Sequence, residues 1–187
     1  MATRRPLQYS LHAAWQATVN SHYDDRQINS ERSLQAVFWQ QLNSELPDSR
    51  RTFIEPRIMS DQLGVTRRRY PDLVICNRST VICVIELKYN PRVGPKHKKD
   101  MQTLKWIAEN RSTLYVENSR YLGDNRLPQR YSFAKRVLFC WASIHKTGAD
   151  YNAKSLSTGF ESLRNSFIEL RAETVINGNA NVSWSDN

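Results

Sequence analysis

Residues 70–90, YPDLVICNRSTVICVIELKYN, decide how this chain folds. Two apolar runs rich in Val, Ile and Cys, at about residues 70–76 and 81–88, are typical of β-strands, and the polar residues between them predict a hairpin turn. The second run does not alternate between apolar and polar residues, which favours a strand that is covered on both faces. The stretch therefore predicts a buried β-hairpin.

The elements on either side of this hairpin predict an α/β fold. Helical spacing of apolar residues indicates amphipathic helices over about residues 6–20, 30–46, 98–109 and 153–174. Asn29 or Ser30 can cap the second helix, and Pro47 ends it. Further strands are expected over about residues 52–59 and 137–144, and residues 112–131 are expected to be mostly loop. The order predicts a mixed sheet between helices.

Three charged residues sit unusually close to the apolar part of the hairpin. Glu86 and Lys88 follow the apolar run of the second strand on one face, because side chains two positions apart point the same way. Asp72 begins the first strand. A three-residue turn over residues 77–79 would make Glu86 the diagonal neighbour of Asp72, whereas a turn of even length would place the two acids on opposite faces. An ordinary Glu–Lys pair on a sheet rim is the structural alternative.

Two carboxylates that lie close together repel each other unless one is protonated or a cation lies between them. Magnesium prefers oxygen ligands and takes one or two carboxylates together with water and substrate phosphate. A metal ion held by Asp72 and Glu86 would activate water and neutralise phosphate charge. Lys88 would hold the attacking water or offset charge that develops on the phosphate.

The motif Pro71-Asp72 followed by Glu86-Leu87-Lys88 resembles the PD-(D/E)xK nuclease superfamily, the restriction-endonuclease-like proteins. The resemblance implies a core of helix, three strands, helix and strand (αβββαβ) over about residues 30–144, with a central mixed four-stranded sheet and extra N- and C-terminal helices. It implies that Asp72, Glu86 and the Leu87 carbonyl bind Mg²⁺ or Mn²⁺, and that Lys88 is the catalytic lysine.

Two further residues enter through the same resemblance. Glu31 is the candidate for the acid that this superfamily often carries on the helix before the strands, although a Glu in the first turn of a helix is also favoured by the helix dipole. Gln102 resembles the helix Gln of the exonuclease-like branch, but Trp106 stands where that branch has a tyrosine. An ordinary exposed Gln is the alternative for Gln102.

Basic residues flank the motif on both sides. They are candidates for contacts with nucleic-acid phosphates, and they comprise Arg67, Arg68, Arg69, Arg92, Lys96, Lys98 and Lys99. The whole chain has 27 Lys and Arg against 18 Asp and Glu, a net charge of +9 and a pI near 9.7. Such a charge favours polyanionic partners, which include nucleic acid, an anionic membrane surface or an acidic protein.

Length and composition set the remaining expectations. The 187 residues predict a single nuclease-like domain over residues 1–176 and a flexible, Asn- and Ser-rich tail over residues 177–187. The three cysteines, which all lie in predicted strands, argue against a disulfide framework and favour a reducing, cytoplasmic location. Neither a secretion signal nor a membrane-spanning run of apolar residues is recognisable.

These observations predict a divalent-metal-dependent nuclease that acts on DNA. An endonuclease of a restriction, repair, recombination or mobile-element system fits best, and a homodimer would supply the two sites that are needed to cut both strands. Two alternatives remain open at this point. One is a non-catalytic nucleic-acid-binding module that keeps only the basic surface, and the other is an interaction subunit of a larger nuclease complex.

Overall fold

The hairpin of residues 70–90 forms the middle of a mixed β-sheet. The structure, a computed structural model, describes residues 4–61, 69–94, 97–118, 129–146, 160–176 and 178–186. Within these residues, strand β4 (Thr80–Asn90) pairs with β3 (Leu73–Cys76) in antiparallel orientation and with β6 (Gln129–Lys146) in parallel orientation. Both faces of β4 are covered between Cys83 and Leu87, as its unbroken apolar run predicts.

The described part of the sheet has eight strands, so the expected four-stranded sheet is too small. The order is β1-β3-β4-β6-β5-β2, and β7 pairs with both β6 and β8. The other strands are β1 (Arg51–Ile54), β2 (Ile58–Ser60), β5 (Leu114–Asn118), β7 (Phe167–Thr174) and β8 (Asn181–Asp186). The four strands of the expected core, β1, β3, β4 and β6, lie side by side, and the additional strands extend the sheet beyond β6.

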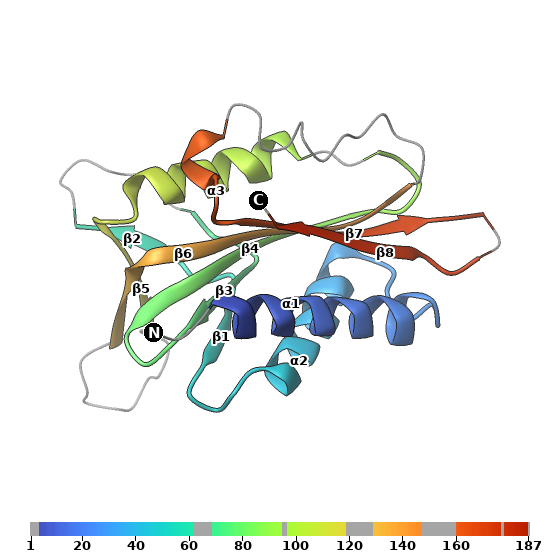
Figure 1. The fold of residues 1–187 in the computed structure, drawn as a ribbon, viewed down its shortest axis with the longest axis horizontal. Coiled ribbons are helices and arrows are strands. Elements are labelled where there is room, and N and C mark those ends of the chain that lie inside the picture. The colour runs from blue at the N-terminus through green and yellow to red at the C-terminus, as the bar shows by residue number, and fades with distance from the viewer. Residues whose placement is uncertain are drawn as a thin grey trace.

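Three α-helices in the described residues cover the two faces of the sheet (Figure 1). Helices α1 (Arg4–Thr18) and α2 (Glu31–Glu45) lie on one face, and α3 (Lys98–Asn110) lies on the other. A π-helical turn, η1 (Val19–Tyr23), continues α1, and a short 3₁₀ helix, η2 (Glu161–Leu163), lies beside α3. No helix in these ranges is long and apolar enough to cross a membrane.

Alternate residues of the central strands pack into two separate cores. Cys83, Ile85 and Leu87 belong to the core under α1 and α2, whereas Val84 belongs to the core under α3. Glu86 and Lys88 have the same parity as Val84 and therefore lie on the α3 face. This arrangement places the charged end of β4 against the N-terminal end of α3.

The hairpin turn has four residues, so the expected three-residue turn is wrong, but a β-bulge compensates for the difference. Cys76 pairs with Val81, and the Asn77 N–H donates to the Thr80 carbonyl at 2.9 Å. The next pair joins Ile75 to Cys83, so Ile82 is the extra residue of the bulge. Because the bulge adds one residue to β4, the residues beyond it face the same sides of the sheet as they would after a turn with an odd number of residues.

The bulge has two consequences for the faces of the hairpin. Ile82 packs against the core under α1 and α2 rather than on the face of Val84 and Glu86, where strict alternation puts it. The pairing of Leu73 with Ile85 brings Asp72 directly opposite Glu86 instead of diagonal to it. The two acids are therefore even closer neighbours than the sequence predicted.

The C-terminal helix expected over residues 153–174 is wrong in the part that the structure describes. Residues 147–159 lie outside the description, and Phe167–Thr174 form strand β7. Phe167 packs in the core under α3, whereas Ile168 and Leu170 pack under α1 and α2. Because this strand buries both faces, its apolar residues occur at both helical and strand spacing, and periodicity cannot separate the two structures.

Two segments that were expected to be irregular also form strands. Leu114–Asn118 form β5, and β6 begins at Gln129, although residues 119–128 lie outside the described part. In the expected flexible tail, Asn181–Asp186 form β8, which pairs with β7 along its whole length. Hydrogen bonds to a neighbouring strand order these polar segments, and such nonlocal bonds leave no periodic signal in the sequence.

Candidate active site: an acidic cluster at the end of β4

Asp72 is held against β4 by hydrogen bonds to both its side chain and its backbone. The Leu87 N–H donates to Asp72 Oδ2 at 2.6 Å. The Asp72 carbonyl accepts from Gln35 Nε2 at 3.0 Å and from the Glu55 N–H at 2.9 Å. Helix α2, the end of β1 and strand β4 therefore converge on this residue and set the position of its carboxyl group.

The carboxyl group of Asp72, which is half-buried, and that of Glu86, which is buried, share a hydrogen bond. Burial raises the pKa of Asp72 to about 6, against the stabilising effect of the Leu87 N–H. Burial, with the nearby charge of Asp72, raises the pKa of Glu86 well above its usual range. One proton shared between the two groups relieves their repulsion, and a bound cation would do the same.

Lys88 lies between Glu31 and Asp100. Its Nζ is 3.2 Å from Glu31 Oε2 and 3.5 Å from Asp100 Oδ2. Burial disfavours the charged ammonium group, but Asp100, Glu31 and Asp72 together outweigh that cost, so the pKa of Lys88 is raised. The ammonium therefore stays charged, and the two flanking carboxylates fix its direction.

The structure brings Glu31, the predicted acid of the preceding helix, next to Lys88. Ser30 caps α2, because its side chain accepts from the Ser33 N–H and the Ser33 side chain accepts in return from the Ser30 N–H. This cap places Glu31 in the first turn, where its Oε2 also accepts from the Tyr89 N–H at 3.4 Å. Glu31 thus joins the start of α2 to the end of β4.

Asp100 is the member of the cluster that the sequence reasoning missed. It lies in the first turn of α3, only 7% of it is exposed, and its Oδ2 accepts from Trp141 Nε1 at 3.3 Å. Burial raises its pKa, although Lys88 opposes this shift. A single acid within the basic run Lys98-Lys99-Asp100 was the available signal, but helix dipoles favour such an acid in any case.

The structure does not bring Gln102 to the cluster. Gln102 is exposed on α3 and lies two residues after Asp100, so the two side chains project from different sides of the helix. The Leu87 backbone, by contrast, is at the cluster. In an extended strand the N–H and C=O of one residue leave the same edge, so the Leu87 carbonyl lies on the edge where its N–H meets Asp72.

A divalent cation fits the chemistry of Asp72 and Glu86. Their oxygens are hard donors, and burial disfavours their charged forms, a cost that a bound cation would offset. Among the residues with described positions, no three His, Cys, Asp or Glu side chains already form a metal-binding group. Two carboxylates with one backbone carbonyl match an ion such as Mg²⁺, which keeps several of its waters.

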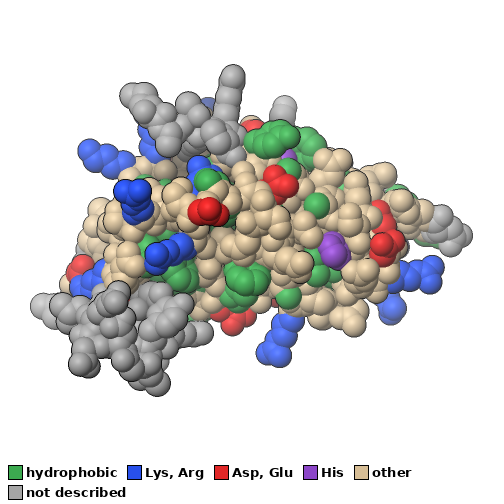
Figure 2. All heavy atoms as spheres, turned by 90° about the horizontal axis from the view of Figure 1, so that it is seen from below, with side chains coloured by type: hydrophobic (Ala, Val, Ile, Leu, Met, Phe, Trp, Pro, Cys, Tyr) green, Lys and Arg blue, Asp and Glu red, His purple; other side chains and the backbone are tan. Residues whose placement is uncertain are grey.

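The predicted phosphate-binding residues differ in where the structure places them. Arg92, Lys98 and Lys99 are exposed near the cluster, whereas Arg69 packs its guanidinium over the Trp106 ring at 5.7 Å from the ring centroid. Arg67, Arg68 and Lys96 lie outside the described residues. On the α1–α2 side, Figure 2 shows Lys and Arg side chains at scattered points near the rim, with acids between them.

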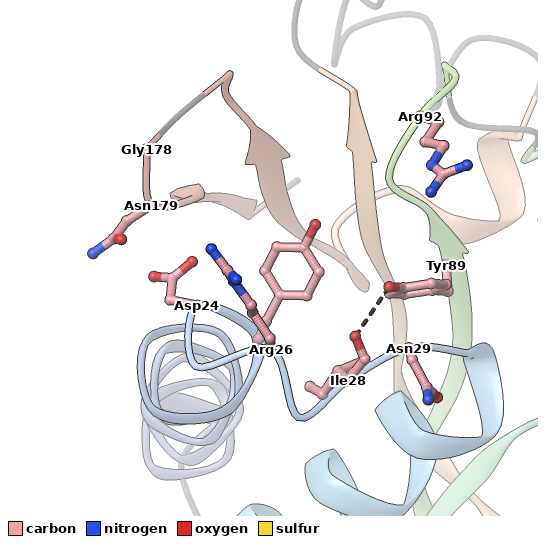
Figure 3. Close-up of a pocket in the computed structure, with 9 residues that line it drawn as sticks. Asp24, Arg26, Ile28, Asn29, Tyr89, Arg92, Gly178 and Asn179 are labelled. Atoms are coloured by element: carbon pink, nitrogen blue, oxygen red, sulfur yellow. Dashed lines mark hydrogen bonds between the residues drawn. The ribbon is translucent and has the colours of Figure 1, made fainter.

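Arg92 also borders a cavity of about 850 Å³ at the end of β4. The cavity adjoins Tyr89, whose hydroxyl donates to the Ile28 carbonyl at 3.0 Å. Arg26 and Arg92 lie on opposite sides of this opening (Figure 3). Asp24 also lines the cavity, so its wall carries charges of both signs.

Comparisons with known proteins give structural neighbours only. Neither protein-family models nor curated protein sequences match the chain. The structure of E. coli MS115-1 NucC in its cAAA-bound form has 13% identity and a TM-score of 0.46, with 99% of this chain and 84% of that chain covered. The cAAA-bound form of P. aeruginosa ATCC27853 NucC has the same identity and TM-score, with coverage of 100% and 85%.

Proposed function

We propose that this protein is a divalent-metal-dependent nuclease that hydrolyses phosphodiester bonds of DNA, with the PD-(D/E)xK type of active site. The observation that carries the proposal is the hydrogen-bonded Asp72–Glu86 carboxyl pair with Lys88 on the same face of the sheet. The spacing of Pro71-Asp72 and Glu86-Leu87-Lys88 fits that superfamily. Strands β1, β3, β4 and β6 lie in this order in the sheet. In the chain, α2 precedes β1 and α3 lies between β4 and β6, which supports the same assignment.

Asp72, Glu86 and the Leu87 carbonyl are the groups that would hold Mg²⁺ or Mn²⁺. The ion, when bound, supplies Lewis acidity toward the phosphate and a water molecule of lowered pKa. The chain contributes a preset geometry, because the Leu87 N–H and the backbone contacts of Asp72 fix the first carboxylate before substrate arrives. Removal of the shared proton from the Asp72–Glu86 pair would accompany metal binding.

Lys88 is placed to orient the attacking water and to offset negative charge on the phosphate. Glu31 and Asp100 hold its ammonium from two sides, so Lys88 acts from a fixed position rather than as a mobile surface charge. Arg92, Lys98 and Lys99 lie near the cluster and are exposed, which suits them to contact the backbone phosphates of a DNA strand. Asp100 and Glu31 are positioning residues in this scheme.

Cleavage of supercoiled plasmid and of linear single-stranded DNA tests the proposal, with Mg²⁺, Mn²⁺ or EDTA present. We expect metal-dependent cleavage, and we expect Glu86→Gln and Lys88→Ala each to lower the rate at least a hundredfold. The matched controls are Glu45→Gln and Lys105→Ala, which change exposed or half-exposed residues elsewhere. Nicking of a closed circle would identify an endonuclease.

The same assay separates the alternatives. Full activity in Glu86→Gln or Lys88→Ala would refute the assignment of the site. Salt-sensitive DNA binding without cleavage under any metal condition would support a non-catalytic binding module. Absence of both cleavage and binding would support an interaction subunit.

A further inference from the structure

A second, strongly basic cavity lies at the other end of α3 from the acidic cluster. Its volume is about 370 Å³, and its walls come from the residue after α3, from the middle of β6, from η2 and from the segment that joins η2 to β7. Figure 1 shows η2 next to α3, above the strands. Helix α3 rises roughly 15 Å between Asp100 and Asn110 at 1.5 Å per residue, so this cavity is separate from the acidic cluster.

Four cationic residues line this cavity, and no acidic residue does. The cations are Arg111, Lys135, Arg136 and Arg164. All four are exposed, and none of them forms a salt bridge with a residue of the described ranges. Arg111 donates from Nη1 to the Ala108 carbonyl at 2.7 Å, which leaves the rest of its guanidinium for other partners. Like charges that converge without a counter-charge favour a bound anion.

An irregularity in β6 explains why neighbouring cations share this cavity. Side chains that follow each other in a regular strand point to opposite faces, yet Lys135 and Arg136 both line the cavity. Between the pairs Val81–Phe133 and Cys83–Leu138, β6 advances five residues while β4 advances two. The extra residues form a bulge that turns both side chains toward the same space, as bulges near functional sites do.

A hydrogen-bond donor without a partner also lines the cavity. The Ser162 hydroxyl oxygen is buried and has no hydrogen-bond partner within the described structure. Buried polar atoms are nearly always hydrogen-bonded, so this hydroxyl is a candidate donor to a group that binds in the cavity. An oxyanion would accept from this hydroxyl and from the guanidinium groups together.

We infer that this cavity binds a phosphate group, with Arg136, Arg164 and Lys135 as its counter-charges and Ser162 as a hydrogen-bond donor. Guanidinium groups pair with phosphate oxygens through two parallel hydrogen bonds, and several of them around one cavity favour phosphate over a monovalent anion. The phosphate belongs either to a small phosphorylated molecule or to the backbone of a nucleic acid. The site is independent of catalysis at Asp72 and Glu86.

Thermal unfolding and calorimetry with inorganic phosphate and pyrophosphate test this inference, with chloride at matched ionic strength as the reference. We expect pyrophosphate to bind the wild-type protein and to raise its Tm. Arg136→Gln/Arg164→Gln should lower the affinity at least tenfold, and Arg57→Gln/Arg78→Gln, which removes two exposed arginines elsewhere, should not. Ser162→Ala should weaken binding severalfold without a change of charge, which covers the case in which the double variant folds poorly.

A second arm identifies the source of the phosphate. DNA binding is measured in EDTA, where no cleavage is needed, at several salt concentrations. If the ligand is the nucleic-acid backbone, the double variant should lower the slope of log K against log salt by about two relative to the control. If the ligand is a small molecule, DNA binding should be unchanged while pyrophosphate binding is lost.

Equal pyrophosphate binding by the wild-type protein and the Arg136→Gln/Arg164→Gln variant would overturn the inference, as would an equal loss in the Arg57→Gln/Arg78→Gln control. Neither result depends on nuclease activity. The proposed phosphate site and the proposed nuclease activity are therefore tested independently of each other.

Discussion

Asp100 Oδ2 lies 3.5 Å from Lys88 Nζ and also accepts a hydrogen bond from Trp141 Nε1. These two contacts join the start of α3 to the parallel strands β4 and β6. Trp141 lies on β6, beside Glu86 of β4. The helix that crosses between β4 and β6 thus supplies a carboxylate to the lysine of the strand before it. The position of Lys88 depends on the crossover as much as on its own strand.

Asp100→Asn should lower cleavage about ten- to a hundredfold, the usual effect of removing a group that orients an active-site residue. The loss of its charge should also lower the pKa of Lys88, since Asp100 is the first of the acids that raise it. The alkaline limb of the profile of kcat/KM against pH should therefore move to lower pH. A reduced rate with an unmoved limb would show that Asp100 acts only through packing against Trp141.

Asp72→Asn should change how stability depends on pH. The pKa of Asp72 is raised from 3.8 to about 6 in the folded protein, so the folded state binds more protons than the unfolded state between these values. Stability from this group is present below about pH 4 and is lost as pH rises through 6.

Asp72→Asn removes this pH-dependent loss of stability. Without metal, its free energy of unfolding should therefore exceed that of the wild-type protein by about 1 to 3 kcal/mol between pH 4 and pH 8. Urea unfolding in EDTA at a series of pH values measures the difference. A stability difference that does not vary with pH would show that Asp72 ionises normally.

Gln35→Ala should destabilise the protein by about 1 kcal/mol, because the variant loses the hydrogen bond from Gln35 Nε2 to the Asp72 carbonyl. The expected decrease in Tm is roughly 2 to 4 °C for a chain of this size. Gln40→Ala on the exposed side of the same helix is the control. Equal Tm values for the two variants would mean that the contact contributes nothing to stability.

The three thiols should be unreactive in the native protein. Cys76, Cys83 and Cys140 are free and buried. Burial raises the pKa of Cys76 to about 12 and raises the pKa values of the other two thiols as well. Since the thiolate is the reactive form, a disulfide reagent at pH 8 should label the protein only after denaturation. Rapid labelling of the native protein would contradict this burial.

Sequence alone was enough for the elements whose signal is local. The run Val81 to Leu87 indicates a strand covered on both faces, Ser30 marks the start of α2, and Pro47 lies just beyond its end. The same local pattern brought Asp72, Glu86 and Lys88 forward as a group. Side-chain period, capping and helix-breaking residues act within a few positions, so they can be recognised without knowledge of the neighbours.

Only the tertiary structure decided which distant residues complete the cluster and how the last third of the chain folds. Asp100 reaches Lys88 because α3 crosses from β4 to β6, and the bulge at Ile82 keeps Asp72 and Glu86 on one face despite a four-residue turn. Strands β7 and β8 exist because β6 offers a free edge to pair with. These outcomes depend on hydrogen bonds and burial between residues far apart in the chain, where local propensity is overridden by packing.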